Sequence, residues 1–128
     1  PLMVERGKGR LALVSSVAGY GGLPTSAAYG ASKAALFNLG ESMAMDLAAS
    51  GVGVSMIAPG FVKTPATDVN SFPMPFIISA EEAAKRMVAG LAKGKTHISF
   101  PKRFSFFLRA INMLPRGAYV RLVGLTKR

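Results

Sequence analysis

The sequence predicts an α/β fold built on a parallel sheet, because segments typical of strands and helices alternate along the chain. Strands are expected at 10–16, 52–58 and 96–100, and helices at about 25–50 and 79–93. The first two strand segments are continuously apolar rather than alternating, which is typical of strands covered on both faces. Strand–helix–strand order favours parallel strands joined by right-handed crossovers.

The two helical segments carry helix periodicity and helix end signals. In the first, apolar residues recur at spacings of three and four: Leu36, Leu39, Met43 and Leu47. Gly51 favours an end after Ser50. In the second, Ser79 and Glu82 form a Ser-x-x-Glu pattern, which predicts a capping box at the helix start.

The remaining segments read as connections and a tail. Residues 2–9 are typical of a helix end and a turn, and 17–24 of a glycine-rich loop. Residues 61–78 form a long irregular stretch containing three prolines. An apolar, aromatic segment at 104–114 stops at Pro115.

The composition bounds the class of protein. Half of the 128 residues are hydrophobic, which is enough for a core in one domain. The absence of cysteine excludes disulfides and cysteine-based metal sites and fits a reducing compartment, so we expect a cytoplasmic protein. The first ten residues are charged, unlike a signal peptide. His97 is the only histidine and has no carboxylate neighbours in sequence, so we expect a surface histidine at a strand edge and no metal site.

The net charge of +10 is concentrated at the C-terminal end. Residues 1–84 hold five Lys/Arg and six Asp/Glu, whereas residues 85–128 hold eleven Lys/Arg and no acid. Such a basic segment could bind a polyanion. No zinc-ligand spacing or RNA-binding motif accompanies it, and its aromatics are interleaved with aliphatic residues, so we expect no nucleic-acid partner.

Three polar residues gather where the first strand meets the following helix. Tyr29 and Lys33 are four residues apart and share a helix face, and Ser16 lies at the strand end. A nearby ammonium could lower the phenol pKa from about 10 by roughly 1–3 units, toward the range useful for acid–base catalysis. A hydroxyl donor, a tunable phenol and a cation suit proton transfer at an alcohol or carbonyl oxygen. None of them can accept a hydride, so a cofactor is implied.

The joint pattern resembles the C-terminal half of the short-chain dehydrogenase/reductase family. It rests on Ser16, on the Tyr-Gly-Ala-Ser-Lys run at 29–33, and on the Pro-Gly-Phe-Val-Lys-Thr run at 59–64. The resemblance implies the C-terminal portion of a Rossmann-like doubly wound sheet, with NAD or NADP as cofactor. It implies that Tyr29 is the catalytic acid/base, that Ser16 polarises the substrate oxygen, and that Lys33 assists Tyr29 and holds the nicotinamide ribose.

The resemblance also assigns cofactor contacts after the second strand. Pro59, Gly60, Val62 and Thr64 would line the nicotinamide end, together with Tyr29 and Lys33. The family's glycine-rich phosphate loop and catalytic asparagine have no counterpart here, and no G-x-G-x-x-G follows a strand. We therefore expect residues 1–102 to be the second half of such a domain, and the isolated chain to be an inactive fragment of an enzyme about twice as long, a multiple that the family pattern supplies.

Two further expectations concern partners. The helix at 26–50 is rich in small residues, and the resemblance implies that it joins subunits of a homodimer or homotetramer. The basic, apolar tail at 103–128 is typical of an interfacial amphipathic segment, so peripheral membrane contact and packing against protein both remain open.

Apolar residues in the loop after the second strand suggest an apolar alcohol or carbonyl substrate: Phe72, Met74, Phe76, Ile77 and Ile78. The alternative is that these residues form a hydrophobic loop that packs on the next helix and binds no substrate. A second interpretation of the whole chain, a non-catalytic binding or membrane-associated protein that keeps the fold, would need neither Ser16, Tyr29 nor Lys33.

Overall fold

A three-stranded parallel sheet forms the centre of the molecule in the computed structural model, which describes residues 2–68, 70 and 73–127. The strands are β1 (Gly9–Val14), β2 (Val52–Pro59) and β3 (His97–Phe100), in the order β1-β2-β3. Val14 pairs with Ile57, and Pro59 pairs with Phe100. The predicted α/β fold with a parallel sheet is confirmed.

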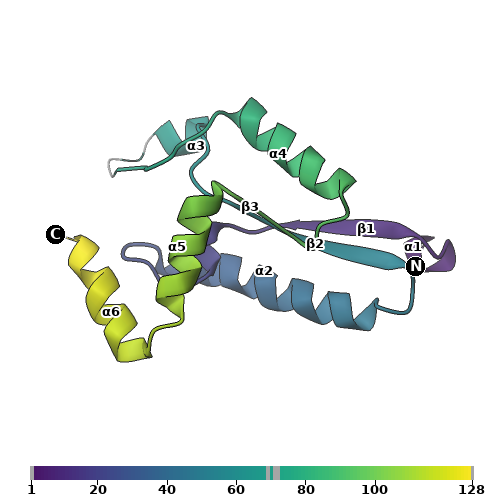
Figure 1. Ribbon diagram of the computed structural model, residues 1–128, viewed down its shortest axis with the longest axis horizontal. Coiled ribbons are helices and arrows are strands. Elements are labelled where there is room, and N and C mark those ends of the chain that lie inside the picture. The colour runs from purple at the N-terminus through teal and green to yellow at the C-terminus, as the bar shows by residue number, and fades with distance from the viewer. Residues whose placement is uncertain (1, 69, 71–72, 128) are drawn as a thin grey trace.

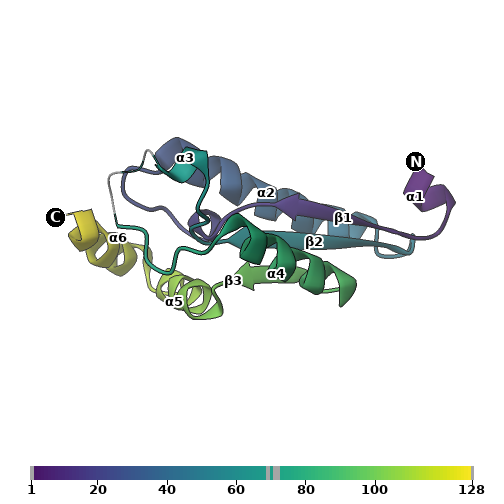
Figure 2. The same ribbon diagram turned by 90° about the horizontal axis from the view of Figure 1, so that it is seen from above.

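Helices cover both faces of this sheet, as Figure 1 shows. α4 packs on one face, and α2 and α5 pack on the other. α1 and α6 lie at opposite ends of the molecule (Figure 2). The helices are α1 (Leu2–Glu5), α2 (Ala27–Asp46), α3 (Pro65–Asp68), α4 (Ala80–Ala92), α5 (Lys102–Asn112) and α6 (Arg116–Gly124), with 3-10 turns η1 (Val17–Gly19) and η2 (Leu125–Lys127).

The core consists of two apolar clusters separated by the sheet. Ile57 packs with Ile98 and with Ala83 of α4. Its neighbour Ala58 packs on the other side with Val17 and Leu108. Successive strand residues point to opposite faces, so a strand covered on both sides must be apolar at nearly every position. This explains the continuous apolar run that predicted β2.

Several element ends differ from the sequence prediction. β1 ends at Val14, since the Ser16 side chain caps η1 immediately afterwards. α2 ends at Asp46 rather than Ser50, and a turn follows up to Gly51, whose φ of +72° suits glycine. At α4, Ser79 Oγ accepts from Glu82 N at 3.2 Å as the capping box predicts.

The segment after β3 is helical and only partly packed. Leu108 of α5 and Tyr119 and Val123 of α6 are buried, and the Tyr119 hydroxyl donates to the carbonyl of Gly22 at 2.8 Å. Among the helices that the structure describes, none combines the length and apolarity needed to span a membrane.

Candidate active site

The carboxyl ends of β1 and β2 meet at one edge of the sheet, because the two strands are parallel. Ser16, two residues beyond β1, is 7% exposed. Its Oγ accepts from Ala18 N at 3.2 Å and donates to the Pro59 carbonyl in a long bond of 3.5 Å. The expected parallel pairing of these two strands therefore brings the residues that follow them together.

Tyr29 and Lys33 occupy one face of α2, near its N-terminal end. The Lys33 Nζ lies 5.6 Å from the centroid of the Tyr29 ring and donates to the Val14 carbonyl at 3.3 Å. Tyr29 is 53% exposed, and its hydroxyl forms no hydrogen bond within the described ranges of the chain. The phenol oxygen is therefore free to bond an external ligand beside a fixed cation.

The first turns of α2 are held closely against the end of β1. Ser15, which is buried, donates from Oγ to the Lys33 carbonyl at 2.7 Å. A methyl group at Gly19 would lie only 2.8 Å from the Lys33 carbonyl carbon, and one at Gly30 would lie 3.3 Å from the Ala18 carbonyl oxygen. The sequence analysis assigned no role to Ser15; the pair of serines at the end of the first strand was the available signal.

The segment after β2 is shaped by a threonine that sequence reasoning missed. Thr67 Oγ1 donates to the Val62 carbonyl at 2.9 Å and accepts from Thr64 N at 2.8 Å. Gly60 N donates to the Phe100 carbonyl at 2.7 Å. These bonds fix the backbone of 60–64, although no hydrogen bond among the described residues joins Thr64 to Ser16, Tyr29 or Lys33.

His97 is not the surface residue that the sequence suggested. Its ring is half-buried and stacks on Tyr20 and Phe37, each with a centroid separation of 5.9 Å. The Tyr20 hydroxyl lies 2.8 Å from His97 Nε2 and 3.0 Å from Ser105 Oγ. Burial lowers the pKa of His97, and the Arg109 guanidinium lowers that pKa further. Within the described residues, no cluster of side chains could hold a metal ion.

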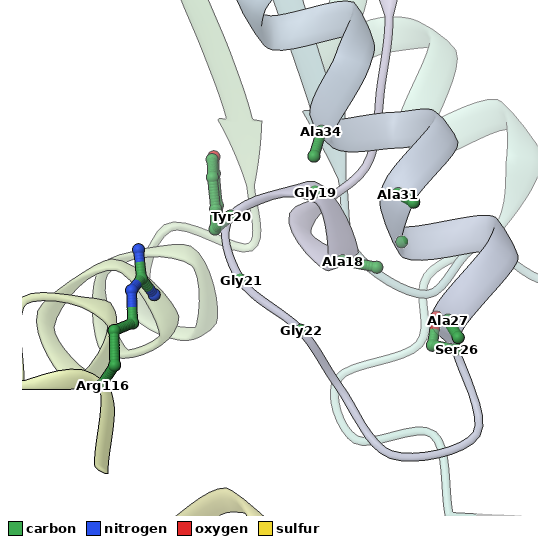
Figure 3. A pocket seen from close by; sticks show the side chains of 11 residues that line it. Ala18, Gly19, Tyr20, Gly21, Gly22, Ser26, Ala27, Ala31, Ala34 and Arg116 are labelled. Carbon is green, nitrogen blue, oxygen red and sulfur yellow. The ribbon is translucent and has the colours of Figure 1, made fainter. Parts of the chain in front are cut away.

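A cavity of about 370 Å³ lies between the glycine-rich loop and α2 (Figure 3). Small residues of α2 form one wall, and Arg116 of α6 contributes a cation. These α2 residues, Ala27, Gly30, Ala31 and Ala34, recur at spacings of three and four, so they form a face distinct from that of Tyr29 and Lys33.

The apolar residues of the loop after β2 are partly accounted for. Phe76 is 61% exposed, and its ring centroid lies 6.1 Å from that of Phe104 in α5. Ile78 packs against the core cluster on the α4 side. Phe72 lies outside the described residues. An apolar substrate surface here stays a prediction.

Comparison with known proteins identifies the family. The family model for short chain dehydrogenases matches residues 1–72, which include the strand-end serine, the Tyr-x-x-x-Lys pair and the Pro-Gly segment. The chain belongs to the short-chain dehydrogenase family. It is 45% identical over 119 residues to an uncharacterized oxidoreductase of Myxococcus xanthus strain DK1622, in a match that covers 93% of this chain and 47% of that protein.

Two further proteins similar to this chain are also about twice its length or longer. An 11-beta-hydroxysteroid dehydrogenase-like protein (4A) of Arabidopsis thaliana is 34% identical over 117 residues, or 84% of this chain and 39% of that protein. A crystal structure of a short chain dehydrogenase from Burkholderia cenocepacia J2315, in complex with NADP, superposes with a TM-score of 0.79 at 24% identity and covers 96% of this chain and 50% of that one. The latter likeness establishes the fold. The chain thus spans about half the length of the curated relatives it matches.

Proposed function

We propose that this chain carries the catalytic half of an NAD(P)-dependent oxidoreductase that transfers hydride between nicotinamide and an alcohol or carbonyl substrate. The observation that carries the proposal is the exposed phenol of Tyr29, which bonds no other described residue and lies beside the Lys33 ammonium, at the sheet edge where Ser16 follows β1. Ligands bind outside the carboxyl ends of the strands in open α/β sheets.

The residues at this edge fit the nicotinamide end of a dinucleotide. Lys33 Nζ has one described acceptor, the Val14 carbonyl, so two of its three N–H donors remain for ribose hydroxyls. Pro59, Gly60, Val62 and Thr64 would line the ring. Two structural neighbours support the choice of NAD or NADP, since one is in complex with NADP and another, from Sphingobium yanoikuyae, with NADPH. When bound, the dinucleotide supplies or accepts hydride at nicotinamide C4.

The chain's own residues handle the proton. Tyr29 donates its phenolic proton to the substrate oxygen as a carbonyl is reduced, and the phenolate takes that proton back in alcohol oxidation. Lys33 stabilises the phenolate by its positive charge. Ser16 donates a hydrogen bond to the same substrate oxygen, for which it gives up only the long bond to Pro59.

The next proposals concern the domain organisation of the full-length protein and the kind of substrate it binds. We propose that residues 1–102 complete a Rossmann-like domain whose other half holds the pyrophosphate, and that the 128-residue chain alone is inactive for want of that cradle. The substrate is proposed to be apolar, from the exposed Phe76 and Ile77. A non-catalytic binding protein with the same fold is the alternative, although no binding role requires the three polar residues together.

Two partner proposals accompany the activity. The small-residue face of α2, Ala27, Ala31 and Ala34 included, would admit a second copy of the protein closely, giving a homodimer or homotetramer. Light scattering of the full-length protein measures this state directly. Residues 103–128 are proposed to contact a membrane peripherally, because exposed apolar residues such as Phe106 and Met113 stand among cations there.

Turnover of the full-length protein tests the activity. Oxidation of NADH and NADPH is followed against a panel of apolar ketones and aldehydes, with the Tyr29→Phe protein as the control. We expect turnover with at least one pair and a loss of at least about 100-fold in the variant. Undiminished turnover in Tyr29→Phe would remove the proposed acid/base, and absence of turnover across the panel would favour the non-catalytic alternative.

A further inference from the structure

A groove of about 580 Å³ runs along the outer side of β3, the edge strand of the described sheet. We call it the basic groove. Its charged and ionisable lining residues come from α4, β3 and α5 and from the connection between α4 and β3: Arg86, Lys93, Lys95, His97, Lys102 and Arg109. No acidic side chain lines it. A concave surface with five permanent cations concentrates positive potential.

These cations are largely uncompensated. Arg86 pairs with Glu82 at 2.7 Å. Within residues 2–68, 70 and 73–127, the Lys93, Lys95 and Lys102 amines have no hydrogen-bond or carboxylate partner. Arg109 lies over the Tyr20 ring at 5.9 Å. Residues 85–128 contain no acid, so no carboxylate side chain of this segment neutralises these cations.

An exposed apolar face adjoins the groove on α5. Phe106 is 76% exposed and lies one helical turn from both Lys102 and Arg109. Met113, one further repeat along that face, is 87% exposed. The buried side of the same helix presents Leu108 to the core. α5 therefore shows a large aromatic residue and cations together to the outside.

The combination of cations in the groove with exposed apolar side chains on α5 favours one kind of binding partner over others. A two-fold contact with a second copy would set each groove's cations against the same cations, which is repulsive. An acidic peptide would balance the charge but leave Phe106 and Met113 in water. An anionic bilayer surface satisfies both, since headgroup phosphates meet the cations and the aromatic ring enters the boundary with the acyl chains.

We propose that the basic groove and the outward face of α5 dock onto the surface of an anionic phospholipid bilayer. Lipid phosphate groups lie against Lys93, Lys95 and Lys102, and Phe106 is the apolar anchor. This inference rests on the peripheral contact proposed for residues 103–128 and extends it to cations before that segment. It is independent of Tyr29 chemistry.

Vesicle flotation of the full-length protein tests the surface. Vesicles of phosphatidylcholine with phosphatidylserine are compared with vesicles of phosphatidylcholine alone. Binding is expected to the first only and to weaken at high salt. A Lys93→Gln/Lys95→Gln variant should bind about 30-fold more weakly, from about fivefold for each cation. Arg6→Gln/Lys8→Gln, which removes two exposed cations outside the groove, is the matched control and should bind like wild type.

Apolar anchoring is tested separately with Phe106→Ser against Val88→Ser, which replaces an exposed apolar residue outside the groove. Only the first should weaken binding. Equal binding to both vesicle types, or wild-type binding by both the groove and the Phe106 variants, would overturn the proposal. A changed oligomeric state in the groove variant, without vesicle binding by wild type, would assign the surface to a subunit contact and also overturn it. Turnover of a soluble substrate, measured without vesicles, should be unchanged in all four variants. This measurement distinguishes a failure of membrane docking from a failure of the proposed oxidoreductase activity.

Discussion

Gly19 controls how closely α2 can approach the end of β1, and replacing it with alanine perturbs the candidate site from a distance. The added methyl group would lie 2.8 Å from both the carbonyl carbon and the carbonyl oxygen of Lys33, and 2.9 Å from Phe37 Cε2. Favourable carbon contacts begin near 3.5 Å. The helix backbone must therefore move by roughly 0.7 Å. Lys33 and Tyr29 move with it.

The expected cost follows from that overlap. Overpacking against backbone lowers the unfolding free energy by about 1–3 kcal/mol. A shift approaching 1 Å at catalytic groups lowers kcat/KM by roughly 10- to 100-fold. Denaturant unfolding and steady-state turnover of the full-length protein measure the two effects.

Gly22→Ala is the matched control, since no described atom outside Gly22 and its two chain neighbours lies within 4 Å of the added methyl group, and φ is not positive. Its unfolding free energy should stay within about 0.5 kcal/mol of wild type. Equal stability and equal turnover in the Gly19→Ala and Gly22→Ala proteins would refute the reasoning that close packing of α2 on the loop positions the site.

Three further predictions concern stability. Burial lowers the pKa of His97 in the folded protein, so the unfolded chain binds a proton more readily than the folded one. The contribution of neutral His97 to the free energy of unfolding is therefore full above pH 6.5, the usual pKa, and is lost as the pH falls through and below that value. His97→Gln should flatten the slope of melting temperature against pH between about 7.5 and 5.5, and an unchanged slope would contradict this. Ile57→Ala, at a 2% exposed core position, should lower the free energy of unfolding by about 2–5 kcal/mol, measured by chemical denaturation. A loss of less than about 1 kcal/mol would contradict the central place of Ile57 in the core. Tyr119→Phe removes the hydrogen bond to the Gly22 carbonyl and should lower the free energy of unfolding by about 1 kcal/mol. An unchanged free energy of unfolding would show that this bond does not hold α6 in place.

The sequence was most informative where local pattern decides structure. Continuous apolar runs identified β1 and β2, and the Ser-x-x-Glu pattern located the start of α4. Element ends were less predictable, as the early end of α2 at Asp46 shows, because apolar spacing continued to Leu47 beyond the last helical residue. Spacing alone also placed Tyr29 and Lys33 on one face.

Long-range contacts were not accessible from the sequence. Tyr20 meets His97 and Ser105 across 77 and 85 residues of chain, and no local pattern marks such a pair. A signal for His97 was nevertheless present: it alternates with Ile98 at the start of a strand, so in a sheet covered on both faces its ring must face a helix layer. Treating the strand edge as solvent-exposed caused the error.

Transfer of a labelled hydride tests the central claim most directly. Full-length protein is supplied with reduced nicotinamide cofactor carrying deuterium at both C4 positions and with a ketone that it turns over. The mass of the alcohol product is measured by mass spectrometry. We expect one deuterium on the carbinol carbon with wild type, and at least about 100-fold slower product formation with Tyr29→Phe. Product without deuterium, or equal rates for the two proteins, would contradict it.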